Sequence, residues 1–125
     1  MSRGRRVLII EDSEDSLELY RFCLEQEGYE VCGVGTLREA VRAAREFAAD
    51  VFVSDLGLPD GSGLDLVRRL RAEGFRTPAI ALTGSAEQHA REEAMAAGFT
   101  DYGAKPCTPD DLLVLIERAL GGAGD

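Results

Sequence analysis

The chain has 125 residues, of which 45% are hydrophobic and 30% are charged, the composition of a single globular domain with a sizeable core. Its 23 acidic and 14 basic side chains give a net charge of −9, which argues against nucleic acid or an anionic membrane as a direct partner. No segment approaches the roughly 20 apolar residues of a membrane-spanning helix, and no secretion signal is recognisable, so we expect a cytoplasmic protein without membrane insertion.

Strand-like and helix-like hydrophobic patterns alternate five times along residues 5–120. Strands are predicted at residues 7–10, 29–34, 51–53, 78–82 and 100–104. Helices are predicted at residues 14–27, 36–48, 64–73, 85–98 and 108–120. The glycine-rich stretch 57–63 is expected to be a loop, and flexible tails are expected at residues 1–4 and 121–125.

The second predicted helix has a recognisable start and a regular apolar face. Thr36 and Glu39 have the spacing of a capping box, in which each residue satisfies a free amide near the other. The residues expected on the buried face are Leu37, Ala40, Val41, Ala44 and Ala48.

The alternation of strands and helices defines the fold class. It is typical of an α/β domain, because parallel strands need a crossover helix between them. Right-handed crossovers then favour a doubly wound sheet with helices on both faces. In such a sheet ligands bind beyond the carboxyl ends of the strands, so the residues at those ends are the candidates for chemistry.

Charged and polar side chains follow four of the five predicted strands. The first strand leads to Glu11 and Asp12, the third to Asp55, the fourth to Thr83 and the fifth to Lys105. Each residue alone has an ordinary structural explanation, such as a helix-end charge, a turn residue, a cap or a solvated lysine. Because the strand ends meet at one edge, we interpret the set together as a functional site.

The residue types in this set indicate a particular chemistry. Three clustered carboxylates repel one another unless a cation lies among them, and oxygen ligands favour Mg²⁺ or Mn²⁺. Zinc and iron are disfavoured, because the lone His89 lies in a predicted helix and the three scattered cysteines are expected to be small buried side chains. A carboxylate between a cation and a lysine is a nucleophile for phosphoryl transfer, and Asp55 is our candidate.

Four motifs give the chain a family resemblance. They read VLIIED (7–12), DLGLPDGSG (55–63), ALTG (81–84) and DYGAKP (101–106). In this order and spacing they resemble the receiver domain of two-component response regulators, over about residues 5–120. The resemblance implies a flavodoxin-like fold, a five-stranded parallel sheet in the order 2-1-3-4-5 flanked by five helices.

The resemblance also implies roles for the site residues. Asp55 corresponds to the phosphoacceptor, Asp12 to the direct ligand of Mg²⁺, and Glu11 to an acid that acts through water. The backbone carbonyl of Gly57 corresponds to a further metal ligand.

The switching residues follow from the same resemblance. Thr83 would bond the phosphoryl group, Lys105 would pair first with the acceptor and then with the phosphoryl group, and Tyr102 would turn inward on activation. The Lys105–Pro106 peptide bond would be cis, which is cheap only before proline.

Partners are implied in the same way. The donor would be a histidine kinase or a histidine phosphotransfer protein. The output protein or covalently linked effector would meet the face made by the fourth helix, fifth strand and fifth helix. Beyond self-phosphorylation and self-dephosphorylation of Asp55, no enzyme activity is expected.

Three residues depart from the usual pattern of the family. Glu11 replaces a commoner aspartate, and we expect an altered water shell around the metal. Gly84 replaces an alanine and should widen access to the site. Gly103 replaces an aliphatic residue of the fifth strand, so we expect thinner packing under the output face.

Other functions fit the same residues less well. A phosphorylation-independent docking module is the alternative on this fold, although such modules usually lack part of the acidic or lysine set. A flavodoxin-like electron carrier is disfavoured because the acidic residues 11–15 would repel a flavin phosphate, and a haloacid-type phosphatase because Gly57 stands where a second acid is expected. A stand-alone regulator, an excised receiver and the receiver of a hybrid kinase all fit the sequence.

Overall fold

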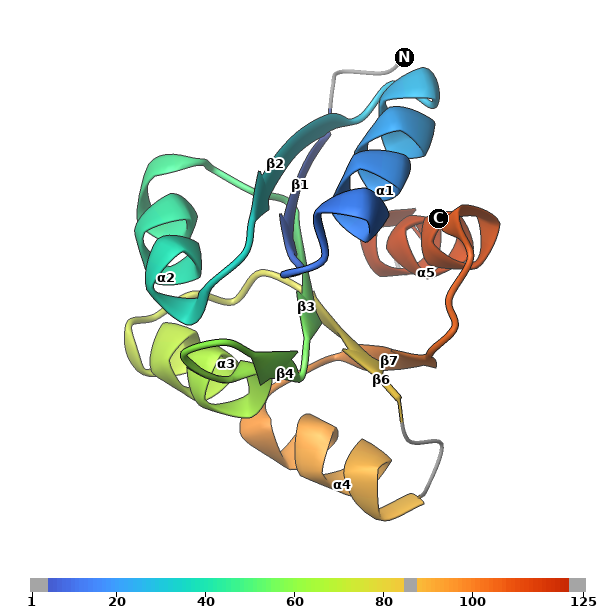
Figure 1. Ribbon diagram of the computed structural model, residues 1–125. Coiled ribbons are helices and arrows are strands. Elements are labelled where there is room, and N and C mark those ends of the chain that lie inside the picture. The colour runs from blue at the N-terminus through green and yellow to red at the C-terminus, as the bar shows by residue number, and fades with distance from the viewer. Residues whose placement is uncertain (1–4, 85–87, 122–125) are drawn as a thin grey trace.

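Five parallel strands form the central sheet of the computed structural model, which describes residues 5–84 and 88–121. The strands are β1 (Arg6–Ile10), β2 (Glu30–Val34), β3 (Val51–Asp55), β6 (Ala79–Thr83) and β7 (Asp101–Ala104). They are ordered β2-β1-β3-β6-β7, so the expected order 2-1-3-4-5 is confirmed (Figure 1). The reversal of strand order lies between β1 and β3, where a ligand site is expected.

Five helices cover the two faces of this sheet (Figure 1). They are α1 (Glu14–Gln26), α2 (Leu37–Glu46), α3 (Gly63–Ala72), α4 (Gln88–Ala97) and α5 (Pro109–Gly121). Helices α1 and α5 pack on one face, and α2, α3 and α4 pack on the other. Among the residues that the structure describes, no helix is long and apolar enough to cross a membrane.

The core is divided into two layers by the alternation of side chains along the strands. In β1, Val7 and Ile9 join the cluster beneath α1 and α5, whereas Leu8 and Ile10 join the cluster beneath α2, α3 and α4. Because helices cover both faces, every position from 7 to 10 is buried. This explains why the strand is a continuous apolar run in the sequence.

Some element boundaries differ from the prediction. Helix α2 ends at Glu46, so the prediction that Ala48 lies on its buried face is wrong, and Ala48 is exposed. The backbone of Phe47 is extended, and its ring packs against the core with the Arg6 guanidinium 4.8 Å above it. That contact takes the chain out of the helix.

Other differences lie near the loops and ends. The expected loop 57–63 contains a short antiparallel hairpin of β4 (Gly57–Leu58) and β5 (Gly61–Ser62). Helix α5 includes Gly121, which was expected in the tail. The expected tail residues 1–4 and 122–125, and the start of the fourth predicted helix at 85–87, lie outside the described residues.

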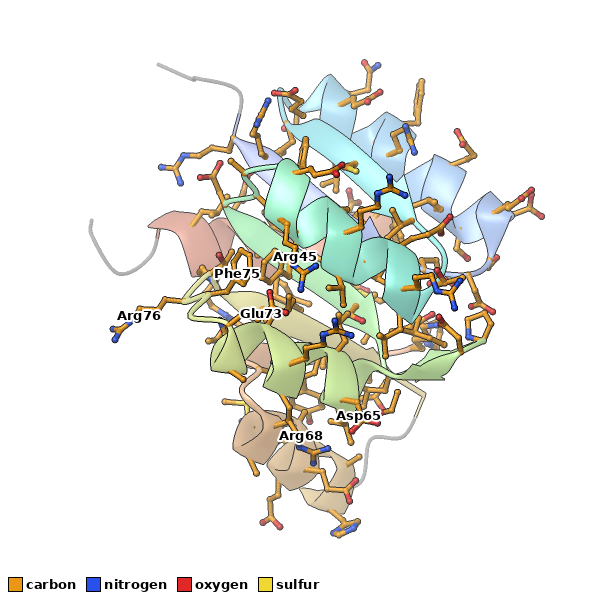
Figure 2. All side chains as sticks on the ribbon, turned by 90° about the vertical axis from the view of Figure 1, so that its left-hand side faces the viewer. Arg45, Asp65, Arg68, Glu73, Phe75 and Arg76 are labelled. Atoms are coloured by element: carbon orange, nitrogen blue, oxygen red, sulfur yellow. The ribbon has the colours of Figure 1, made fainter. Side chains whose placement is uncertain are left out.

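An ion pair joins α2 to the end of α3, on the face of the sheet opposite α1. Figure 2 shows Arg45 of α2 and Glu73 at the end of α3 pointing toward each other, and their closest nitrogen and oxygen atoms are 2.7 Å apart. Glu73 also lies 3.5 Å from Arg69. Since exposed pairs of this kind contribute about 0–1 kcal/mol, the apolar layer beneath dominates the packing of α2 on α3.

Candidate functional site

The carboxyl ends of four strands bring the predicted site residues together. Glu11 directly follows β1, and its amide donates a 2.9 Å hydrogen bond to the carbonyl of Val34, which extends the pairing with β2. Asp55 and Thr83 are the last residues of β3 and β6. Lys105 follows β7, and its amide donates a 2.7 Å hydrogen bond to the carbonyl of Thr83.

Two carboxylates of the site are buried beside a lysine. Glu11 and Asp55 are each 4% exposed, whereas Asp12 is exposed. The Lys105 ammonium forms an ion pair with the Asp55 carboxylate, and it lies 3.6 Å from the Glu11 carboxylate. Because a buried charge is tolerated only when it is paired, Lys105 makes the burial of these two acids possible.

The environment of Asp55 changes its acidity. Burial raises its pKa to about 6, with a further contribution from the negative charge of Glu11, while the hydrogen bond from Lys105 acts in the opposite direction. Burial disfavours the ionised form of Lys105, but the hydrogen bond and charge of Asp55, together with Glu11, raise its pKa above the ordinary value. Asp55 and Lys105 are therefore both ionised at neutral pH. Because the Asp55 carboxylate is buried, it binds a cation more readily than a solvated carboxylate does.

Three carboxylates lie close enough to share one cation. Oxygen atoms of Glu11, Asp12 and Asp55 all lie within 4.8 Å of one another. Glu11 is held in place because its Oε2 atom accepts a 2.9 Å hydrogen bond from the amide of Ser13, the N-cap of α1. An all-oxygen donor set of this kind suits a hard divalent ion such as Mg²⁺. Gly57, the predicted carbonyl ligand, lies two residues beyond Asp55 at the start of β4.

The loop after Asp55 packs tightly against the backbone of the phosphoacceptor candidate. The amide of Gly63 donates a 2.8 Å hydrogen bond to the carbonyl of Leu56. A Cβ atom at Gly63 would overlap the carbonyl oxygen of Asp55, so only glycine allows α3 to start this close to the site. Sequence reasoning missed Gly63, although its place in the glycine-rich loop was a signal.

The segment that carries Lys105 has two unusual features. The Lys105–Pro106 peptide bond is cis. The carbonyl of Cys107 accepts a 2.7 Å hydrogen bond from the hydroxyl of Tyr20, a buried residue of α1. Sequence reasoning missed Tyr20; the available signal was a tyrosine on the buried face of a helix, where its hydroxyl needs a partner.

The predicted switch residues Thr83 and Tyr102 lie on the neighbouring strands β6 and β7, and α4 contacts Tyr102. Tyr102 of β7 is half-buried, and the guanidinium of Arg91 from α4 lies 5.1 Å from the centre of its ring. Gly84 follows Thr83 and is exposed, with open space where a Cβ atom would be. His89 is also exposed, on α4, and its Nε2 atom lies 3.5 Å from a carboxylate oxygen of Glu93.

The packing around Gly103 differs from the prediction. A Cβ atom at Gly103 would lie 2.8 Å from Cδ1 of Leu115 and 3.4 Å from Cδ2 of Leu82. The expectation of thinner packing is therefore wrong at Gly103 itself, because the Leu115 side chain fills the space. A shallow groove of about 330 Å³, lined by Gly103, Val114 and Leu115 among others, lies beside this contact.

The fold and the site together define a flavodoxin-like α/β domain with an acidic, lysine-containing site where the strand order reverses. The family model of the response regulator receiver domain matches residues 7–117. The chain belongs to this family. Receiver domains are signalling modules of two-component systems, which relay signals from histidine kinases to output domains.

Individual proteins of the family are similar along nearly the whole chain. The transcriptional regulatory protein KdpE of Mycobacterium tuberculosis is 38% identical over 91% of this chain, which spans 50% of KdpE. The chemotaxis response regulator CheY4 of Vibrio cholerae superposes with a TM-score of 0.89 at 30% identity, covering 94% of this chain and 100% of CheY4. The receiver domain of the sensor histidine kinase PA1611 of Pseudomonas aeruginosa, solved with a magnesium ion coordinated in its active-site cleft, has a TM-score of 0.85 at 35% identity, with 95% and 99% of the two chains covered.

Proposed function

We propose that this domain is a phosphorylation switch in which Asp55 accepts a phosphoryl group from a phosphohistidine donor. The observation that carries the proposal is the buried Asp55 carboxylate at the end of β3, paired with Lys105 and next to Glu11. A purely structural aspartate would gain nothing from a second buried acid, because the two negative charges repel each other.

The chemistry follows from the arrangement of these groups. An oxygen of the Asp55 carboxylate attacks phosphorus, so a P–O bond forms while the P–N bond of the phosphohistidine breaks. The electron pair of the broken bond returns to the imidazole nitrogen of the donor. The Lys105 ammonium, already paired with Asp55, stabilises the negative charge on the transferred group.

Glu11, Asp12 and Asp55 would hold a magnesium ion, with the carbonyl of Gly57 as a further ligand. The closeness of the three carboxylates supports this assignment, as does the magnesium ion in the PA1611 receiver domain. When bound, the ion would neutralise part of the charge on the phosphoryl oxygens.

Transmission of the signal would begin at Thr83. Its hydroxyl would bond a phosphoryl oxygen, and Tyr102 would turn inward as Thr83 moves. The half-buried position of Tyr102 supports this role, because a ring at the edge of the core can occupy either an outer or an inner position. The surface of α4, β7 and α5 would then present a changed face to an output partner.

The donor would be a cytoplasmic histidine kinase or a histidine phosphotransfer protein. The output partner would be a separate protein or an effector on the same chain, since relatives such as KdpE are about twice the length of this chain. No direct contact with nucleic acid is expected from the net charge of −9.

The test is phosphorylation of the purified domain with acetyl phosphate, followed by intact-mass spectrometry. We expect the mass of one phosphoryl group to be added in the presence of Mg²⁺, with no addition after chelation. Asp55→Asn should abolish labelling. Asp65→Asn, a change at an exposed acid on α3, should leave it intact and is the matched control (Figure 2).

Two outcomes would overturn the proposal. One is an unlabelled wild-type domain that binds Mg²⁺ normally, and the other is labelling that survives Asp55→Asn. A partner that binds wild type and Asp55→Asn equally, with and without Mg²⁺, would instead support a phosphorylation-independent docking module.

A further inference from the structure

A buried hydrogen bond connects α1 to the segment that carries Lys105. The hydroxyl of Tyr20 donates to the carbonyl oxygen of Cys107 at 2.7 Å, across 87 positions of the sequence. Tyr20 is 6% exposed and Cys107 is 9% exposed, so water has little access to either group. A backbone carbonyl in such a place needs a partner, and the tyrosine supplies it.

The segment 105–108 is held at both ends as well as at this midpoint. At its start, the Lys105 amide donates a 2.7 Å hydrogen bond to the carbonyl of Thr83. At its end, Thr108 and Asp111 exchange hydrogen bonds of 3.1 and 3.0 Å in a capping box that begins α5. The bond from Tyr20 lies between these two anchors and links this segment to α1.

Helix α1 is itself attached to the acidic side of the site. It begins directly after Asp12 and Ser13, and the Ser13 amide donates to Glu11 at 2.9 Å. Tyr20 therefore connects the element that follows the acids to the loop that presents the lysine. The Lys105 ammonium, two residues before Cys107, meets Asp55 and Glu11 at the junction.

We propose that Tyr20 is a positioning residue for Lys105: its hydroxyl fixes the Cys107 carbonyl and thereby holds the lysine against the phosphoacceptor. This inference rests on the proposed function of Asp55. A shift of the loop would move the ammonium away from the transferred phosphoryl group, because only Pro106 separates Lys105 from Cys107.

The hydroxyl of Tyr20 remains a donor over the working range of the protein. Burial raises its pKa to about 12, and the carboxylates of Glu11 and Asp55 act in the same direction. The hydroxyl is therefore protonated near neutral pH and can donate to Cys107.

The ring of Tyr20 also packs in the core beneath α1 and α5, so a purely packing role must be separated from positioning. Tyr20→Phe separates them, because it keeps the ring and removes only the hydroxyl. Tyr29→Phe is the matched control: Tyr29 packs against the same core layer, but next to the start of β2, at the opposite end of the strands from the site.

The experiment measures the rate of phosphorylation by acetyl phosphate and, on the same samples, the Mg²⁺ affinity from amide chemical shifts. We expect Tyr20→Phe to slow phosphorylation about fivefold, the effect of losing one hydrogen bond. Its Mg²⁺ affinity should match wild type, because the acids are untouched, and this titration also reports the folded fraction. Tyr29→Phe should behave as wild type in both measurements.

A double-mutant cycle with Lys105→Ala tests whether Tyr20 acts through the lysine. In the Lys105→Ala background, Tyr20→Phe should cause no further loss of rate. An equal loss with and without Lys105, or a Tyr20→Phe rate equal to wild type, would overturn the inference. Failure of the wild-type domain to be phosphorylated at all would instead count against the proposed function.

Discussion

At the scale of single residues, opposing effects set the pKa of Asp55. Burial and the neighbouring Glu11 favour its protonated form, whereas Lys105 favours the carboxylate. The result is a buried acid with a pKa of about 6, which is ionised at neutral pH without being strongly stabilised as an anion. A phosphoacceptor needs this condition, since it must be both ionised and ready to bond phosphorus.

The first prediction concerns stability without magnesium. The pKa of Asp55 rises from 3.8 to about 6 on folding, so its bound proton stabilises the fold fully below pH 3.8 and not above about pH 6. We expect Asp55→Asn to raise the free energy of unfolding by about 1–3 kcal/mol near pH 7.5, and this gain to disappear near pH 4. Urea denaturation at a series of pH values measures it.

The control for this prediction is Asp65→Asn, whose carboxylate is exposed on α3. It should change stability little at any pH. Lys105 remains partly solvated and keeps Glu11 as a partner, so the loss of Asp55 leaves no isolated buried charge. A gain from Asp55→Asn that did not vary with pH would contradict the assigned protonation.

At the scale of elements, α4 is held differently along its length. The guanidinium of Arg71 donates hydrogen bonds of 3.1 and 2.8 Å to the carbonyl of Gly98, directly after the helix ends. Further toward its start, Arg91 lies over the ring of Tyr102. The C-terminal end of α4 is thus tied to α3, whereas the contact with Tyr102 is a single cation–π interaction that a rotation of the ring would break.

The second prediction is that Arg91→Ala favours activation. The cation–π contact stabilises the observed position of the Tyr102 ring by about 0.5–1 kcal/mol, so its loss should ease the proposed inward turn. Its loss should increase the apparent affinity for beryllofluoride with Mg²⁺ about two- to fivefold. Titration followed by the amide shifts of Tyr102 and Thr83 measures it.

Arg68→Ala provides the matched control, because Arg68 is an exposed arginine on α3 that pairs with Asp65 rather than with a ring (Figure 2). It should leave the beryllofluoride affinity unchanged. An unchanged or weaker affinity for Arg91→Ala would show that Arg91 does not restrain Tyr102.

At the scale of the whole molecule, the charge balance and the cation site are coupled. The chain carries a net charge of −9, and three of its acids converge at one edge of the sheet. Repulsion within that cluster opposes folding, and a divalent ion bound there would remove it.

The third prediction is that Mg²⁺ stabilises the domain by binding rather than by screening. At a concentration tenfold above its dissociation constant it should add about 1.4 kcal/mol. The melting temperature should then rise by roughly 4–6 °C. Thermal unfolding by circular dichroism measures this, with NaCl at equal ionic strength as the control.

Asp12→Asn should remove most of this stabilisation, because it takes away one of the three carboxylates. An equal rise in NaCl, or an undiminished rise in Asp12→Asn, would mean that the effect of Mg²⁺ does not come from this site.

The apolar run 7–10 predicted a strand buried on both faces, because periodicity reflects which faces of an element are covered. The predicted positions of Glu11, Asp55, Thr83 and Lys105 at one edge followed from the parallel sheet, since all its carboxyl ends point the same way. The end of α2 was missed because the contact of Phe47 with Arg6 joins distant parts of the chain.

The sequence by itself therefore determined the alternation of strands and helices, and the acids and lysine at one sheet edge, because these follow from local periodicity and one rule of topology. Only the tertiary structure decided how those groups are held. The bond from Tyr20 to Cys107, the place of Arg91 over Tyr102 and the filling of space at Gly103 by Leu115 all join residues from different elements. Such pairs depend on the exact packing of helix against sheet, which no local pattern encodes.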